Sequence, residues 1–196
     1  MIIAVLSGAS LAVSGVLFQA VLKNPLADPG IIGITSCAEC VTAIVVALFP
    51  KLYLVSPLLA FLGGMCGCAL VYTLSYKNGF SPLRIILVGI AVDATFSGLT
   101  NACSSIGGQN YQSASEMLKA NISLKTWDDV KMLVVYVVIG LIVSVFISQK
   151  CNLLSLEDKA IRGLGINVTL LRLFVSVVAV LLASINAAVV GTVSFV

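Results

Sequence analysis

The chain is interrupted at Lys23-Asn24-Pro25-Leu26-Ala27-Asp28-Pro29, a short polar segment between two long apolar runs. Each proline lacks a backbone N–H and disfavours helical geometry in the residue before it, so a continuous helix cannot pass through this segment. Asn24 and Asp28 precede the two prolines, and their short polar side chains can bond the backbone groups that are left free there. We therefore expect a tight polar turn between two membrane-spanning helices.

The composition is that of a membrane protein. The 196 residues are 60% hydrophobic and 10% charged, with a mean hydropathy of +1.14. A soluble domain could not bury so much apolar surface, whereas a bilayer is itself an apolar solvent. The expected fold class is all-α, a polytopic transmembrane helix bundle of about six membrane helices. The apolar runs, each near the roughly 20 residues that span hydrocarbon, are 1–22, 31–49, 54–76, 83–106, 130–149 and 169–193.

Several classes of function are excluded by what the sequence lacks. It has no histidine, which removes imidazole metal sites and His-dependent catalytic triads. It also has no Gly-x-x-x-x-Gly-Lys-Ser/Thr phosphate loop. We therefore expect that the chain is not an enzyme and does not itself hydrolyse ATP. Cys37 and Cys40 have no second pair to complete a four-ligand site, so we predict no metal and no cofactor. The basic residues form no block, which argues against nucleic acid as a partner.

Lysine and arginine fall unevenly on the two sides of the predicted bundle. If the connectors alternate across the membrane, seven of the 11 basic residues lie on one side. These are Lys23, Lys77, Arg84, Lys150, Lys159, Arg162 and Arg172. The positive-inside rule then predicts that the turn at 23–29 and the loop at 150–168 are cytoplasmic. Within the membrane, Gly63-Gly64-Met65-Cys66-Gly67 has a small-xxx-small spacing, which predicts close helix packing inside one bundle.

A second polar stretch, Ser155-Leu156-Glu157-Asp158-Lys159-Ala160-Ile161-Arg162-Gly163-Leu164-Gly165-Ile166, predicts a short helix. Ser155 and Asp158 fit a capping box at its start, and Gly163 or Gly165 can supply the left-handed residue that ends it. An apolar stripe at four-residue spacing runs along the helix, through Leu156, Ala160 and Leu164. This stripe needs a partner, which could be the membrane surface or another protein.

Both polar stretches resemble a known family. The run from Gly8 through Gln19 to Asn24-Pro25-Leu26-Ala27-Asp28-Pro29 and Gly33 is similar to the signature of the FecCD family. That family comprises the permease subunits of ABC importers for iron–siderophore, haem and cobalamin. The matching signature positions are Gln19, Asn24, Pro25, Asp28 and Pro29. Leu156-Glu157-Asp158-Lys159-Ala160, followed by Leu164-Gly165, resembles the family's cytoplasmic coupling loop, with Glu157 standing where glycine is usual.

The resemblance implies a transport role that the residues alone do not. It predicts that 155–166 is a coupling helix for a separate ATPase subunit, and that the other partners are an extracytoplasmic substrate-binding protein, a second permease chain and membrane lipid. The expected location is the cytoplasmic membrane of a bacterium or archaeon. Residues 1–196 would be one permease domain, truncated at both ends relative to a ten-helix type. The expected ATPase-coupling positions are Leu156, Glu157, Asp158, Ala160, Arg162, Leu164 and Gly165.

Two acidic residues within the apolar runs leave other functions open. Asp93 lies deep in the fourth run, where a carboxylate is costly unless it faces water or a partner, and Asn101 follows on the same side of the helix. The resemblance places this helix beside the substrate pathway, which makes Asp93 and Asn101 candidate lining residues. Glu39 is expected near the cytoplasmic end of its run. An ion-coupled secondary transporter using Asp93 and Glu39, and a membrane remnant without transport activity, are the alternatives.

Overall fold

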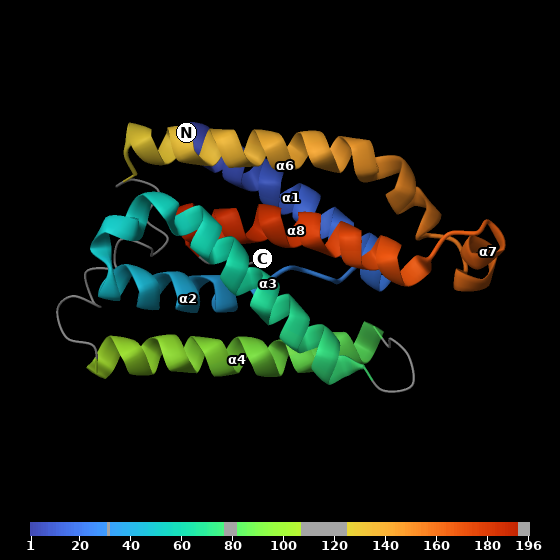
Figure 1. Ribbon diagram of the computed structural model, residues 1–196, viewed down its shortest axis with the longest axis horizontal. Helices are drawn as coiled ribbons and strands as arrows, with labels where there is room; N and C mark the ends of the chain where they lie inside the picture. Colours follow the sequence, from blue (N-terminus) through green and yellow to red (C-terminus); the bar gives the residue numbers. More distant parts are fainter. Residues whose placement is uncertain (31, 77–81, 107–124, 192–196) are drawn as a thin grey trace.

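The computed structural model describes residues 1–30, 32–76, 82–106 and 125–191. In these ranges the chain is helical, with seven α-helices and one short 3-10 helix (Figure 1), which confirms the expected all-α class. The α-helices are α1 (Ile2–Leu22), α2 (Ile34–Leu48), α3 (Ser56–Ser75), α4 (Pro82–Ile106), α6 (Trp127–Leu153), α7 (Asp158–Gly163) and α8 (Val168–Val190). The 3-10 helix η1 (Pro50–Val55) joins α2 to α3.

Five of the helices, α1, α3, α4, α6 and α8, are long and apolar enough to cross a membrane. The second apolar run, 31–49, was expected to form a membrane-spanning helix, but its helix α2 has only 15 residues. At 1.5 Å per residue such a helix falls well short of the hydrocarbon thickness. The prediction of six runs of spanning length is therefore wrong at α2.

The polar turn after α1 explains why α2 is short. Lys23 ends α1 in the left-handed conformation (φ 51°), and Asn24 N–H donates to the Gln19 carbonyl at 3.2 Å. The Asn24 side chain then accepts a hydrogen bond from Leu26 N–H at 3.0 Å, as expected for an asparagine before a proline. The chain runs back into the bundle from there, and α2 begins inside it (Figure 1).

A close contact with α4 shows how deep within the bundle α2 begins. A Cβ on Gly33 would lie 2.9 Å from Asp93 N and 3.0 Å from the Gly89 carbonyl oxygen, both in the middle part of α4. Gly33 also has a positive φ of 75°, so the position favours glycine for both reasons. Because α2 starts at this depth and runs away from the end of the bundle at which α7 lies (Figure 1), Glu39 in its second turn lies away from that end, which the charge bias predicts to be cytoplasmic.

The helix α8 forms the centre of the bundle. In its most apolar 18-residue window 78% of the residues are buried, against 17% in α4, which lies on one flank with α6 on the other (Figure 1). Buried polar side chains bind α8 to α1: Ser14 Oγ donates to the Ala179 carbonyl at 2.7 Å, and Asn186 Nδ2 donates to the Ser7 carbonyl at 3.2 Å. The predicted close packing at Gly63 and Gly67 is confirmed, since both face α2.

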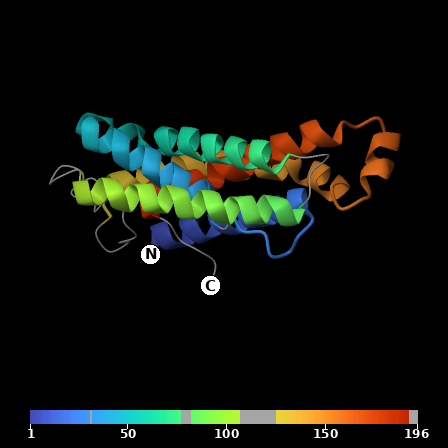
Figure 2. The same cartoon turned by 90° about the horizontal axis from the view of Figure 1, so that it is seen from below.

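The helix ends alternate between the two ends of the bundle as the connectors were expected to. The C-terminal ends of α1, α3 and α6 and the first turns of α4 and α8 lie at one end, and α7 projects beyond them (Figures 1 and 2). We call this the α7 end. It carries Lys23, Arg162 and Arg172, whereas Lys131 lies at the opposite end.

Candidate functional site

The candidate site is the loop from Leu154 to Asn167, which contains α7 and connects α6 to α8. Its inner side is held by Leu154 and Ile161, whose side chains are fully buried. The three positions of the predicted apolar stripe are all exposed, Leu156 to 44% and Leu164 to 62%. Only Ala160 lies in α7, because Leu156 precedes the helix and Leu164 is its C-cap, so the stripe does not form a continuous face of α7. The loop is thus anchored to the bundle by two buried side chains and carries exposed apolar side chains before, in and after α7.

The start of α7 differs from the expected capping box. Ser155 Oγ donates to the Asn152 carbonyl at 2.7 Å, and α7 begins at Asp158 without a side-chain cap. The prediction is wrong because the Asp158 carboxylate binds cations from other helices instead of the first turn of its own. The end of α7 is as expected, since Gly165 supplies the left-handed residue with φ 77°. The Asn167 side chain then caps α8 by accepting from Thr169 N–H at 3.1 Å.

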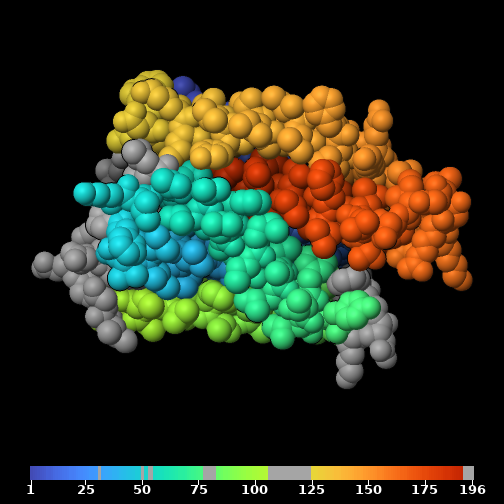
Figure 3. All heavy atoms as spheres, in the orientation of Figure 1, coloured from blue at the N-terminus to red at the C-terminus, as the bar shows by residue number. Residues whose placement is uncertain are grey.

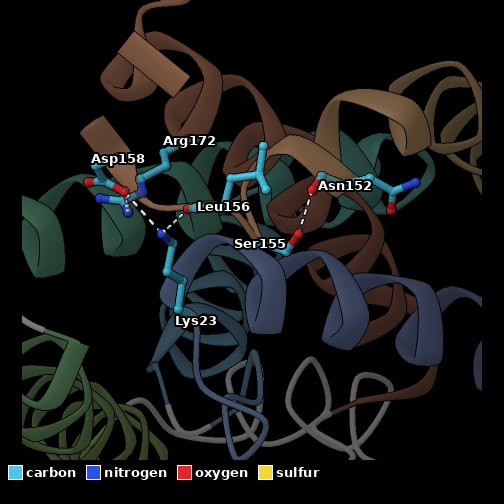
Figure 4. A network of polar contacts seen from close by, with 6 residues as sticks. All are labelled: Lys23, Asn152, Ser155, Leu156, Asp158 and Arg172. Carbon is cyan, nitrogen blue, oxygen red and sulfur yellow. Dashed lines mark hydrogen bonds and ion pairs between the residues drawn. The ribbon is translucent and has the colours of Figure 1, made fainter. Parts of the chain in front are cut away.

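Asp158 joins three elements through one carboxylate oxygen (Figure 4). Its Oδ1 lies 3.0 Å from Lys23 Nζ, at the end of α1, and 3.0 Å from Arg172 Nη2, in the second turn of α8. Lys23 Nζ also donates to the Leu156 carbonyl at 2.6 Å. We call Lys23, Asp158 and Arg172 the Asp158 cluster. It ties α7 to the end of α1 and to α8, the central helix of the bundle.

The charges of the Asp158 cluster keep the carboxylate ionised. Partial burial raises the pKa of Asp158, but the hydrogen bond from Lys23 and the positive charges of Arg172, Lys23 and Arg162 outweigh it and lower the pKa below its usual value of 3.8. The stabilisation is therefore fully present above the usual pKa and is lost only as the pH falls through the lower folded-state value. The cluster is intact at neutral pH.

The Asp158 cluster also connects the two sequence motifs. Lys23 immediately precedes the signature turn, in which Asp28 and Pro29 are buried, Asn24 is half-buried and Pro25 exposed. The remaining signature residue, Gln19, is half-buried in the last turn of α1. The sequence pattern assigns Lys23 only to the basic side of the bundle, because its partner Asp158 lies 135 residues further along the chain. The only local signal for its role is that it stands between α1 and the first proline of the turn.

The candidate pathway residues lie on α4, away from this loop. Asp93 is half-buried and its backbone faces Gly33 at the start of α2, whereas Asn101 is exposed. Glu39, on α2, is half-buried. In the ranges that the structure describes, no three His, Cys, Asp or Glu side chains lie together in a way that could hold a metal ion. The role of Asp93 and Asn101 as lining residues of a substrate pathway stays a prediction.

At the end of the bundle opposite α7, α6 begins at Trp127 with a capping box, in which Thr126 N–H donates to Asp129 Oδ2 at 2.8 Å. Trp127 itself is exposed, as a residue at the membrane interface would be. In the polar stretch before α6 the sequence also predicts a short helix around 113–120, and these residues lie outside those that the structure describes.

Comparison with known proteins gives a match over the whole sequence. Residues 1–196 match the FecCD transport family. Similar curated proteins include the "Probable heme-iron transport system permease protein IsdF" of Staphylococcus aureus strains bovine RF122 / ET3-1 and NCTC 8325 / PS 47. Each is 37% identical over 194 residues, which cover 99% of this chain and 58% of the relative. The chain thus spans little more than half the length of these relatives.

A solved structure has a similar fold. It is described as a metal-chelate type ABC transporter in an inward-facing conformation, and it superposes with a TM-score of 0.81 at 27% sequence identity. The similar region covers 98% of this chain and 62% of that one. One family is indicated by the two sequence motifs, by the match along the full chain and by the shared helical architecture. The chain belongs to the FecCD transport family.

Proposed function

We propose that the chain is part of a permease subunit of an ATP-driven importer, and that the loop 155–166 receives a separate ATPase subunit. The main observation behind this proposal is that the loop containing α7 is anchored to the bundle and still exposes apolar side chains. Ile161 and the Asp158 cluster hold the loop against the bundle, and Leu156 and Leu164, which flank α7 in the chain, stay exposed. Exposed apolar side chains on an anchored loop suit a groove in a partner protein, and an anchored loop can transmit a movement of that partner to α1 and α8.

The proposed substrate class is an iron chelate, haem or cobalamin. The names of the similar proteins support it, since they refer to haem-iron transport and to a metal-chelate transporter. A second permease chain and an extracytoplasmic binding protein would complete the importer, in the cytoplasmic membrane of a bacterium or archaeon. In this arrangement the chain itself carries out no chemical reaction.

Charge reversal on α7 is expected to weaken capture of the ATPase. Arg162 is exposed on α7 and is not one of the two cations that form ion pairs with Asp158, although its charge helps to lower the pKa of that carboxyl. An Arg162→Glu chain should recover at least about tenfold less ATPase in a pull-down from membranes, since one interfacial charge pair lost is worth about 1.4 kcal/mol or more. The ATPase used is the one encoded nearest to the gene.

The matched control reverses a cation at the opposite end. Lys131 is exposed and pairs with Asp128, so Lys131→Glu changes the net charge by the same amount away from α7. This variant should recover as much ATPase as the unchanged chain. If Arg162→Glu and Lys131→Glu recover equal amounts, α7 is not the docking site.

A further inference from the structure

A crevice between α3 and α8 opens at the α7 end. The two helices diverge toward this end in Figure 1, and Figure 3 shows them bordering each other on the visible face, α3 in green and α8 in red to orange. The first part of the crevice is an apolar slot of about 190 Å³. Met65 and Ala69 of α3 and Leu173 and Val177 of α8 line it, and it is partly open to the surface of the bundle.

A second pocket, of about 230 Å³, adjoins the slot at the α7 end. Tyr72 and Arg172 line both spaces. The second pocket has apolar walls from Val21, Leu22 and Ile85, and it adds the charged side chains of Lys23 and Asp158. Charged groups therefore enter the lining near the first turns of α8.

Arg172 has hydrogen-bonding capacity that the chain does not use. Its side chain is only 17% exposed, and Nη2 binds Asp158. Its Nε is buried and finds no acceptor among the described residues. The nearby hydroxyls of Tyr72 and Ser176 bind each other at 2.8 Å. A buried donor without an acceptor is costly, so the chain itself does not fully compensate the burial of the Arg172 side chain.

The charges that line the pocket favour an anion. Lys23 and Arg172 contribute two positive charges and Asp158 one negative charge, which leaves one positive charge in excess. Basic pockets between membrane helices at the cytoplasmic side bind the headgroups of anionic lipids. A soluble anion would use the pocket but would leave the adjoining apolar slot unfilled.

We propose that this crevice binds one anionic phospholipid, with an acyl chain in the slot between α3 and α8 and the phosphate at Arg172 and Lys23. The positive charge that Lys23 and Arg172 contribute in excess of Asp158 selects an anionic headgroup over a zwitterionic one. The proposal requires only that the helices lie in a membrane, so it stands apart from the ATPase proposal. Lipid in the crevice would also support the Asp158 cluster from the membrane side.

The test is native mass spectrometry of the purified chain in detergent, titrated with phosphatidylglycerol or with phosphatidylcholine of the same acyl chains. We expect the phosphatidylglycerol complex to exceed the phosphatidylcholine complex about fivefold, the contribution of one basic residue near an anionic headgroup. Arg172→Gln should abolish that preference. Ala69→Phe, which fills the slot without changing a charge, should reduce the binding of both lipids.

Two controls make the test decisive. Lys159→Gln removes an exposed cation at the same end that does not line the crevice, and it should leave the preference unchanged. Ala69→Phe leaves the Asp158 cluster intact, so it tests the slot even if Arg172→Gln fails to fold. Equal binding of the two lipids, an equal loss in Lys159→Gln and Arg172→Gln, unchanged binding in Ala69→Phe, or displacement of the lipid by millimolar inorganic phosphate would each overturn the proposal.

Discussion

Replacement of Asp158 by asparagine is expected to loosen the loop 154–167 from the bundle. The change removes the carboxylate that holds Lys23 and Arg172, each at 3.0 Å, and leaves these two cations facing each other. Because the carboxylate is 39% exposed, solvent screens both pairs, and we expect the loop to lose about 1–2 kcal/mol of its attachment rather than the larger energy of a buried pair. A loss of that size raises the population of detached loop about tenfold.

Hydrogen exchange measures this detachment directly, since amides exchange when a segment opens locally. In Asp158→Asn the amides of 158–166 should exchange about tenfold faster than in the unchanged chain, while those of α8 beyond its first turns stay protected. Asp158→Glu, which keeps the charge, should restore part of the protection. Lys131→Gln breaks an exposed ion pair at the other end and should change nothing in the loop. Unchanged exchange in Asp158→Asn would show that the cluster does not hold α7.

The second large effect is expected at Gly63, where α3 crosses α2. A Cβ there would lie 2.9 Å from the Cys37 carbonyl oxygen, 2.9 Å from Val41 Cβ and 3.0 Å from Ala38 Cα. Two of these atoms belong to the backbone of α2, so α2 itself would have to move. We expect Gly63→Ala to destabilise the protein by about 1–3 kcal/mol, as overpacking in a close-packed interior does.

Gly98 provides the matched control because it is also a glycine within a membrane helix. A Cβ on Gly98 meets no atom within 4 Å, so Gly98→Ala should be neutral or should stabilise α4 by up to about 1 kcal/mol through reduced backbone freedom. The measurement is unfolding of the purified variants in mixed micelles with increasing SDS. If Gly63→Ala and Gly98→Ala unfold at the same SDS fraction, α2 and α3 do not pack as closely as described.

The long helices could be predicted from hydropathy because each lies in one continuous apolar run, and a bilayer requires all backbone groups within such a run to be paired. The length and depth of α2 could not. The run 31–49 is as apolar as the others, and nothing in it shows that the chain first re-enters the bundle. The misplacement of Glu39 follows from the same cause, since its position was inferred from an α2 that began at the membrane surface.

In the loop 154–167, too, features that depend on neighbouring residues could be predicted from the sequence, whereas contacts with other helices could not. The left-handed Gly165 and the exposure of Leu156 and Leu164 follow from local spacing, and the structure has both. The capping role predicted for Asp158 is wrong, because its carboxylate binds Lys23 at the end of α1 and Arg172 in the next helix, α8. Lys23 lies 135 residues away, and no periodicity relates it to Asp158.

The most direct test of the account is a photo-cross-link from the outer face of α7. A photoreactive phenylalanine derivative replaces Leu164, which is 62% exposed, and in a control chain it replaces Val145, which is 70% exposed on α6. Each chain is irradiated in membranes together with the ATPase. The account predicts a covalent adduct with the ATPase from position 164 and none from position 145. Absence of an adduct at 164, or equal yields from the two positions, would contradict the assignment of α7 as the coupling helix.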